Sequence, residues 1–287
     1  MNDDRYSTAD RAAFVFVHGA WHGAATWDLV VDELAARGHA AIAIDLPGAG
    51  ANAAVPDSFH RRPLDLDAFA TEPSPNAAVT QEERTAEVID AVRRAATVGN
   101  GDVVLVGHSL GGVTVSEVAE TIPDELRAVV YLAAFYLVEG AVTVGEAMAG
   151  GHVPEMFLAD PAAVGALRLD PLSDDPAYVA QLRAFFYADL DDATFESARR
   201  TLHCDEPAAL GGSASTLTPE RFGTIDRHYI RCADDLAITA EGQDLMVQRS
   251  DAALGSTTTV HRMATSHSPF WSDPAGLADI LVSIAAS

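Results

Sequence analysis

Short apolar runs alternate with longer amphipathic stretches along most of this 287-residue chain. Runs of strand length stand at residues 13–18, 40–45, 103–106, 127–133, 228–232 and 257–263. Helical patterns follow most of these runs. This order of elements predicts an α/β protein with a mostly parallel central sheet flanked by helices.

Several predicted helices carry recognisable start signals. An amphipathic helix is expected over residues 26–37, where apolar positions recur at helical spacing. A second helix begins after Thr80, because Thr80 and Glu83 have the spacing of a capping box. The last helix has Asp273 as its cap and Pro274 in its first turn.

Two segments interrupt the alternation. Residues 46–79 are irregular and contain five prolines, and loops of that length are usually functional or disordered. After the predicted strand that ends near Ala133, the alternation of strands and helices stops, and it resumes only at the predicted strand 228–232. We therefore expect residues 137–217 to form a mostly helical cap inserted into an α/β core of residues 1–136 and 218–287.

Length and composition agree with one globular domain. A chain of this length with 48% hydrophobic residues buries a substantial single core. The longest apolar runs are too short to span a bilayer, and the first five residues are acidic rather than the start of a secretion signal, so we expect a cytoplasmic protein. Cys204 and Cys232 are the two cysteines, and so small a number argues against a disulfide framework.

The chain is strongly acidic, with a formal net charge of −24. Such a charge repels nucleic acid and anionic membranes, so neither is expected as a partner. A solvated acidic surface that keeps the protein in solution explains the charge without a partner. All 18 basic residues are arginine, and the lack of lysine excludes a Schiff-base enzyme and a Walker-type phosphate site.

The candidate nucleophile lies in the glycine-rich turn from Gly107 to Gly112, between an apolar strand and a helical segment. A serine on such a turn is held in strained backbone geometry, and flanking glycines let the neighbouring chain pass closely. Ser109 has Gly107 and Gly111 at those positions, and the Leu110 amide points to where negative charge develops during acyl transfer. A glycine-rich junction of a nucleotide-binding fold is the competing interpretation.

A serine nucleophile needs a histidine base and usually an acid that orients it, in the chain order serine, acid, histidine for this kind of sheet. Asp234 and Asp235 follow the predicted strand 228–232, at the sheet edge where open α/β proteins place functional groups. His267 follows the predicted strand 257–263. The residues alone therefore indicate His267 as the base and either aspartate as the acid.

The loop after the first strand is expected to supply a second oxyanion donor. Gly19 and Gly23 let this loop bend back over the nucleophile, and we assign the donor to the backbone N–H of Ala20. His18 and His22 are four residues apart, but they lie in a loop with no acidic residue between them, which argues against a metal site. Neither a metal nor a cofactor is expected.

Together these motifs resemble the α/β-hydrolases, and within them the group that holds plant methylesterases and hydroxynitrile lyases. The matching pieces span nearly the whole chain and lie at residues 17–23, 45–48, 107–112, 131–135, 229–232 and 266–270. The resemblance implies an α/β-hydrolase fold and selects Asp235 as the acid of a triad with Ser109 and His267. It also implies a homodimer, because similar members are often dimers.

Two departures separate the chain from the lyase branch of this group. That branch carries a threonine beside the first oxyanion loop and a lysine directly after the catalytic histidine. This chain has Gly19 and Ser268 at those positions. Because the lysine serves to hold cyanide in the lyases, the resemblance implies an esterase rather than a lyase.

The cap and the core together offer apolar residues for a substrate pocket. The expected lining residues are Trp21, Phe135, Met148, Met156, Phe157, Phe186, Tyr187, Leu236 and Phe270. Ordinary packing of cap helices is the alternative for each of them alone. Arg168 and Arg183 are cap arginines that remain candidates for binding a substrate carboxylate. Since neither is clearly placed to do so, we expect a small, neutral, fairly hydrophobic ester as the substrate.

The sequence therefore predicts a serine hydrolase that cleaves such an ester through an acyl-enzyme on Ser109. The same fold and residues are compatible with cofactor-free carbon–carbon bond cleavage, with lactonase or amidase activity, and with a ligand receptor that retains residual hydrolysis. A structural or interaction protein with a relict pocket is a further class. The complete set of serine, acid and histidine argues against that class.

Overall fold

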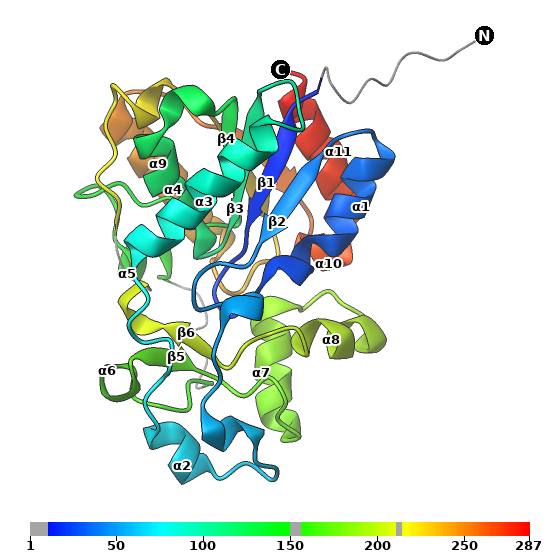
Figure 1. The fold of residues 1–287 in the computed structure, drawn as a ribbon, viewed down its shortest axis with the longest axis vertical. Helices are drawn as coiled ribbons and strands as arrows, with labels where there is room; N and C mark the ends of the chain where they lie inside the picture. The colour runs from blue at the N-terminus through cyan, green and yellow to red at the C-terminus, as the bar shows by residue number, and fades with distance from the viewer. Residues whose placement is uncertain (1–10, 150–155, 211–213) are drawn as a thin grey trace.

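A computed structural model describes residues 11–149, 156–210 and 214–287. The acidic start of the chain and parts of the expected core and cap lie outside the described residues, so the division between core and cap stays a prediction. Figure 1 shows a central sheet with helices on both faces, and a second group of shorter elements below the sheet.

Six strands form one parallel sheet in the order β2-β1-β3-β4-β7-β8. They are β1 (Ala13–Val17), β2 (Ala41–Ile44), β3 (Val103–His108), β4 (Ala128–Leu132), β7 (Asp226–Cys232) and β8 (Thr259–Met263). Each strand lies on a predicted apolar run. Parallel neighbours require crossover connections, which is why helices separate the strands along the chain. The predicted α/β architecture with a mostly parallel central sheet flanked by helices is confirmed.

Helices cover both faces of the sheet. They are α1 (Asp28–Ala36), α3 (Gln81–Ala96), α4 (Gly111–Thr121), α9 (Ala240–Leu254) and α11 (Pro274–Ala285). Helices α1 and α11 pack together on one face, and α3 and α4 on the other (Figure 1). Side chains alternate between the faces of a strand. Phe14 and Phe16 of β1 therefore join the cluster of α1 and α11, whereas Val15 and Val17 join that of α3 and α4.

The helix starts follow the predicted capping signals. Thr80 caps α3, because its hydroxyl accepts from the Glu83 N–H while the Glu83 carboxylate accepts from the Thr80 N–H at 2.9 Å. Asp273 caps α11 by accepting from the Gly276 N–H at 2.9 Å. The helix expected over residues 26–37 is two elements, a 3₁₀ turn at Ala24–Trp27 and then α1.

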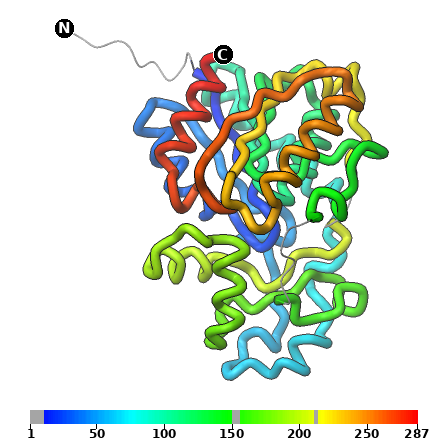
Figure 2. Tube along the Cα trace, turned by 180° about the vertical axis from the view of Figure 1, so that it is seen from behind, coloured from blue at the N-terminus to red at the C-terminus, as the bar shows by residue number. Residues whose placement is uncertain are grey.

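Residues 156–210, between β4 and β7, lie below the sheet, at the carboxyl ends of its strands, whereas residues 214–225 run back up beside it (Figures 1 and 2). The described α-helices and strands between β4 and β7 are α5 (Val144–Ala147), α6 (Pro161–Val164), β5 (Ala166–Arg168), α7 (Pro176–Phe186), α8 (Asp192–Arg199) and β6 (Asp205–Pro207). The strands β5 and β6 pair antiparallel. We call this group of elements the cap.

Part of the irregular segment 46–79 packs with the cap rather than with the sheet. It forms α2 (Leu66–Thr71), which lies beside the cap in Figure 1. The Arg168 guanidinium donates to the Glu72 carbonyl at 2.7 Å and to both carboxylate oxygens of Asp205 at 2.7 Å. The side chains of Arg168 and Asp205 are fully buried. This ion pair therefore ties the segment around α2 to both strands of the cap.

The described ranges have two further features, one of their helices and one of their cysteines. None of the helices there is both long and apolar enough to cross a membrane. Cys204 and Cys232 are buried free thiols. Burial raises the pKa of the Cys204 thiol to about 12, so this group stays protonated at neutral pH.

Candidate active site

Ser109 occupies the turn between β3 and α4 with a φ of 51°. This left-handed conformation is costly for a residue with a side chain, and it is typical of a nucleophile on a strand-to-helix turn. A Cβ atom at Gly111 would come within 2.6 Å of the His18 carbonyl oxygen, and one at Gly107 within 2.7 Å of the Val115 side chain. The close approach of neighbouring chain therefore requires glycine at both flanking positions.

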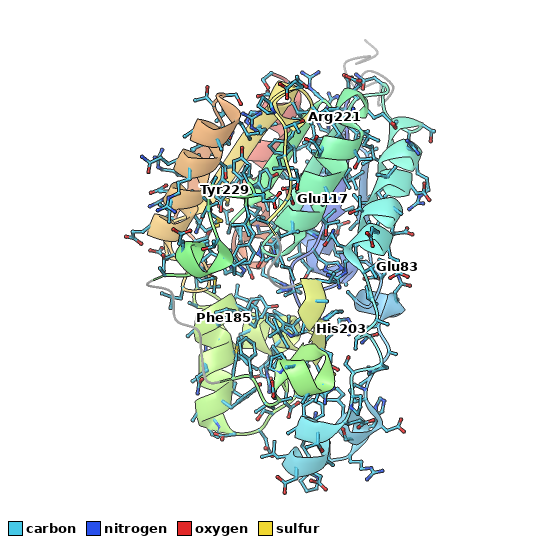
Figure 3. All side chains as sticks on the ribbon, turned by 90° about the vertical axis from the view of Figure 1, so that its left-hand side faces the viewer. Glu83, Glu117, Phe185, His203, Arg221 and Tyr229 are labelled. Atoms are coloured by element: carbon cyan, nitrogen blue, oxygen red, sulfur yellow. The ribbon has the colours of Figure 1, made fainter. Side chains whose placement is uncertain are left out.

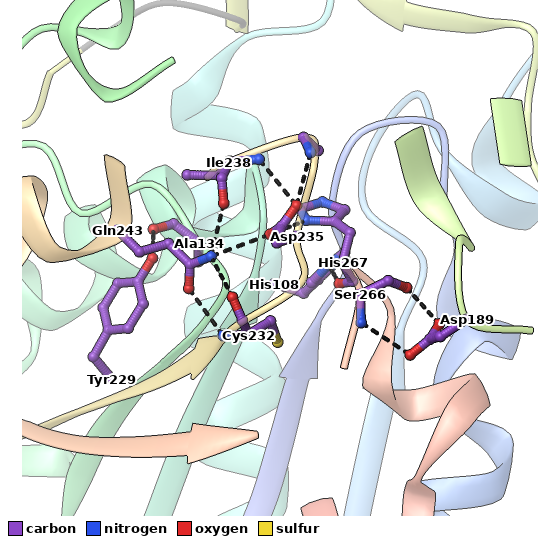
Figure 4. Close-up of polar contacts among 11 residues, drawn as sticks. His108, Ala134, Asp189, Tyr229, Cys232, Asp235, Ile238, Gln243, Ser266 and His267 are labelled. Atoms are coloured by element: carbon purple, nitrogen blue, oxygen red, sulfur yellow. Dashed lines mark hydrogen bonds and ion pairs between the residues drawn. The ribbon is translucent and has the colours of Figure 1, made fainter. Parts of the chain in front are cut away.

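His267 and Asp235 form a buried hydrogen-bonded pair (Figure 4). His267 Nδ1 lies 2.7 Å from Asp235 Oδ2, and both side chains are almost completely inaccessible to solvent. They stand in the loops after β8 and β7, whose backbones are joined by a 3.0 Å hydrogen bond from the Asp234 N–H to the Thr265 carbonyl. Asp234 itself is exposed. Of the two candidate aspartates, the structure brings Asp235 to the histidine.

Hydrogen-bond donors surround the Asp235 carboxylate. Its Oδ1 accepts from the N–H groups of Ala237 and Ile238 at 2.8 and 3.0 Å. Its Oδ2 accepts from Gln243 Nε2 at 3.3 Å as well as from His267. Such donors satisfy a buried carboxylate and fix its direction. Gln243 lies on α9, and sequence reasoning did not predict it because its partners come together only in the fold.

His108 connects the serine turn to the histidine loop. Its Nε2 lies 2.9 Å from the His267 carbonyl oxygen, and the two ring centroids are 4.6 Å apart. Burial lowers the pKa of His108 well below its ordinary value, so the neutral ring donates this bond from Nε2–H. In the described part of the chain, the Ser109 hydroxyl is not hydrogen-bonded to His267. Catalytic hydrogen bonds are often long without substrate and tighten when it binds.

The loop after β1 lies beside the serine turn. Ala20, Ser109 and Leu110 all line the same cavity. The Trp21 N–H is engaged elsewhere, because it donates to Glu206 Oε2 at 3.1 Å. Of these two residues, Ala20 is therefore the one whose backbone N–H is a candidate oxyanion donor.

His18 and His22 of this loop use both ring nitrogens within the protein. His18 Nδ1 lies 2.8 Å from the Gly19 carbonyl oxygen, and its Nε2 accepts from a backbone N–H at 3.2 Å. His22 Nδ1 lies 2.7 Å from the Ala20 carbonyl oxygen, and its Nε2 lies 3.0 Å from the Tyr187 hydroxyl. Burial lowers the pKa of both rings to about 3, so both are neutral. Their role in this structure is to shape the loop.

A cavity of about 300 Å³ opens beside Ser109. The predicted residues on its wall are Trp21, Phe135, Met148, Phe157 and Phe186. Further wall residues are Val144, Gly145, Leu167, Phe185, Ala237 and Ile238, and Figure 3 shows Phe185 on the cap side of the molecule. The described residues of this wall include no charged side chain. Arg168 and Arg183 are paired with carboxylates elsewhere and do not reach it.

The structure corrects the expected lining at four positions. They are Met156, Tyr187, Leu236 and Phe270. Met156 and Tyr187 are fully buried in the packed core, and the Phe270 ring is buried with its centroid 4.8 Å from that of His108. Leu236 is 44% exposed. Leu236 lies in the tight turn in which the Asp235 carboxylate accepts hydrogen bonds from the N–H groups of Ala237 and Ile238, and its exposed side chain is not on the cavity wall.

Comparison with known proteins gives matches over nearly the whole chain. The model of an alpha/beta hydrolase family matches residues 14–280. Esterase PIR7B of rice (Oryza sativa subsp. japonica) is 31% identical, with 97% of each chain covered. The pyrethroid hydrolase of Sphingobium wenxiniae is 26% identical, over 94% of this chain and 86% of that protein. The crystal structure of polyneuridine aldehyde esterase is similar with a TM-score of 0.68 at 22% identity, over 96% of this chain and 99% of that one.

Proposed function

Because the chain belongs to the alpha/beta hydrolase family, we propose that it is a carboxylic ester hydrolase with Ser109 as its nucleophile. The observation that carries this proposal is the left-handed Ser109 turn, joined through His108 to the buried pair of His267 and Asp235. Relatives that are named esterases support ester hydrolysis as the reaction class.

In the first half of the reaction, the Ser109 oxygen attacks the ester carbonyl carbon while His267 Nε2 takes the hydroxyl proton. Asp235, bonded to Nδ1, holds the ring in the required tautomer and stabilises the imidazolium that forms. The N–H groups of Ala20 and Leu110 bind the negative oxygen of the tetrahedral intermediate. The carbon–oxygen bond to the leaving group then breaks, and His267 gives its proton to the departing alcohol.

In the second half, a water molecule takes the place of the alcohol. His267 accepts one water proton as the water oxygen attacks the acyl carbon. The bond between the acyl group and Ser109 breaks, and His267 returns the proton to the serine oxygen. One ester and one water have then become one acid and one alcohol, with the enzyme unchanged.

The cavity supports a small, neutral, fairly hydrophobic ester as the substrate. Its wall offers aromatic and aliphatic surface from Trp21, Phe135 and Phe186, with Ser109 as its reactive polar group. A substrate carboxylate would lose its water there without meeting a cation, which costs several kcal/mol. Neutral esters should therefore be preferred over esters that carry a second, ionised carboxyl group.

The test is steady-state hydrolysis of p-nitrophenyl esters from acetate to octanoate by the wild type and Ser109→Ala. We expect kcat/KM to fall at least about a thousandfold in the variant, because the nucleophile is lost. Ser283→Ala, a serine on the exposed face of α11, is the matched control and should match the wild type. Hydrolysis at the wild-type rate by folded Ser109→Ala would contradict the proposal.

A further inference from the structure

The turn between α7 and α8 contacts both loops that carry the proposed catalytic groups. We propose that this turn, residues 187–189, positions His267 through Asp189 and the Ala20 loop through Tyr187. The inference rests on the proposed function, since it assigns the turn a task toward those groups. Neither side chain is on the wall of the cavity beside Ser109, so both act as positioning residues.

Asp189 binds the residue directly before His267 (Figure 4). The Ser266 N–H donates to Asp189 Oδ2 at 2.9 Å, and the Ser266 hydroxyl donates to Asp189 Oδ1 at 2.5 Å. Ser266 is 1% exposed, so these bonds lie at the inner side of the cap turn. A hydrogen bond to an ionised acceptor is about twice as strong as one between neutral groups. The cap thus holds the histidine loop by two strong contacts at one residue.

His267 is consequently fixed from three directions. Asp235 holds its ring at Nδ1, and His108 holds its carbonyl oxygen. Both of these contacts come from the core, whereas Asp189 holds the preceding residue from the cap. The imidazole must keep Nε2 within hydrogen-bond reach of Ser109. A displacement of about 1 Å costs on the order of a hundredfold in rate, so the third contact has a measurable effect on turnover.

Tyr187 reaches the other loop by a chain of two hydrogen bonds. Burial raises the pKa of its phenol well above the ordinary value, so the hydroxyl donates to the neutral ring of His22 at Nε2, 3.0 Å away. The opposite ring nitrogen of His22 then donates to the Ala20 carbonyl at 2.7 Å. The hydroxyl of the cap tyrosine therefore fixes the backbone at Ala20, whose N–H is the proposed oxyanion donor.

The turn also follows directly on residues that contact the substrate cavity. Phe185 and Phe186, at the end of α7, lie on its wall. A substrate group that packs against these two rings therefore lies next to the turn that holds both catalytic loops. Because the side chains of Tyr187 and Asp189 act on the two catalytic loops rather than on the cavity wall, a loosened turn should lower kcat for a small ester and leave KM almost unchanged.

The experiment measures kcat and KM for p-nitrophenyl acetate in Asp189→Ala, Asp189→Glu and Tyr187→Phe. We expect kcat to fall about tenfold to a hundredfold in Asp189→Ala, with KM within about twofold of the wild type. Asp189→Glu should recover much of the loss, because it restores a carboxylate at a position that is exposed. Tyr187→Phe should also lower kcat. Asp192→Asn, a matched loss of charge at a side chain that is 93% exposed, should leave kcat unchanged.

A double variant tests whether Asp189 acts through Ser266. Ser266→Ala removes the hydroxyl, and Asp189→Ala with Ser266→Ala should be no slower than Asp189→Ala alone, because the partner is already lost. If the alanine variant of Asp189 does not fold, Asp189→Asn replaces it, since it preserves the shape.

Three results would overturn the inference. They are an unchanged kcat in folded Asp189→Ala, a rise in KM without loss of kcat, and fully additive losses in the double variant. Each would leave the turn with a purely structural role. Wild-type hydrolysis by Ser109→Ala would instead contradict the proposed function itself, so the two failures are distinguishable.

Discussion

The Asp235 carboxylate accepts hydrogen bonds from Ala237, Ile238, Gln243 and His267, and it is 3% exposed. Each oxygen thus has two donors. The carboxylate cannot rotate without breaking several of these bonds, so it holds the imidazole in one orientation. This is the condition under which an acid can keep a histidine in the tautomer that accepts a proton at Nε2.

Asp235→Asn tests this orientation at constant volume. The amide places an N–H₂ group where an acceptor is needed and no longer stabilises the imidazolium, so we expect kcat to fall about a thousandfold to ten-thousandfold. Asp234→Asn is the matched control, because Asp234 is exposed and its backbone N–H, rather than its side chain, bonds to the histidine loop. Stopped-flow or steady-state ester hydrolysis gives the comparison. Equal activities of the two variants would count against Asp235 as the acid.

Sequence patterns could identify residues whose neighbours along the chain carry the signal. Ser109 lies between glycines in a strand-to-helix turn, and His267 follows a strand. Gln243 gave no such signal, because its bonds to Asp235 depend on how α9 packs against the loop after β7. Leu236 is exposed in the tight turn at Asp235 rather than on the cavity wall, and its apolar character along the chain gave no sign of this.

Helix α3 of the core and strand β6 of the cap are joined by a buried ion pair. Arg84 Nη1 lies 2.7 Å from Glu206 Oε1, and the two side chains are 3% and 1% exposed. The second carboxylate oxygen of Glu206 accepts from the Trp21 N–H. One carboxylate therefore connects α3, β6 and the loop after β1. Removing it would leave a charged guanidinium buried, which is costlier than losing a surface ion pair.

Glu206→Gln should reduce the free energy of unfolding by about 3–5 kcal/mol, because it leaves the buried Arg84 charge uncompensated. Urea denaturation is the measurement. Glu125→Gln is the matched control, since Glu125 and Arg93 form an exposed pair whose loss should cost about 1 kcal/mol or less. Similar losses in both variants would contradict the account. If Glu206→Gln does not fold, the double variant Arg84→Met with Glu206→Leu removes both charges and should recover stability.

The elements of the sheet were predictable because each strand is a local apolar run. The association of α2 with the cap was not, because the contacts of Arg168 with Glu72 and Asp205 join positions far apart in the chain. The short strands β5 and β6 likewise depend on their pairing rather than on a periodic pattern. Local patterns therefore predict the strands of the central sheet. The arrangement of the cap depends on polar contacts between positions far apart in the chain, which those patterns do not show.

Across the whole molecule, buried histidines link stability to pH. Burial lowers the pKa of His18 and His22 to about 3, and that of His108 well below its ordinary value. In the unfolded chain these groups take up protons near pH 6.5. Below pH 6.5 the unfolded state therefore binds more protons than the folded state. The contribution of these neutral histidines to the free energy of unfolding is fully present above pH 6.5 and is lost as the pH falls.

The free energy of unfolding should therefore fall between pH 6.5 and pH 5, a range above the titration of ordinary carboxylates. Each such histidine contributes up to about 1.4 kcal/mol per pH unit. Urea denaturation at pH 7.5, 6.5, 5.8 and 5 measures the slope. His18→Gln should reduce the slope, whereas His60→Gln, at an exposed histidine, should leave it unchanged. A free energy that is constant or rises on acidification would contradict the assignment.

The most direct test of the central claim is to trap the nucleophile with diethyl p-nitrophenyl phosphate and locate the adduct by peptide mass spectrometry. In this reaction the serine oxygen attacks phosphorus and p-nitrophenolate leaves. The account predicts one diethylphosphoryl group on Ser109, with one equivalent of p-nitrophenolate released and no adduct in Ser109→Ala. An adduct on another residue, or persistent ester hydrolysis by protein that carries no adduct on Ser109 after exhaustive treatment, would contradict it.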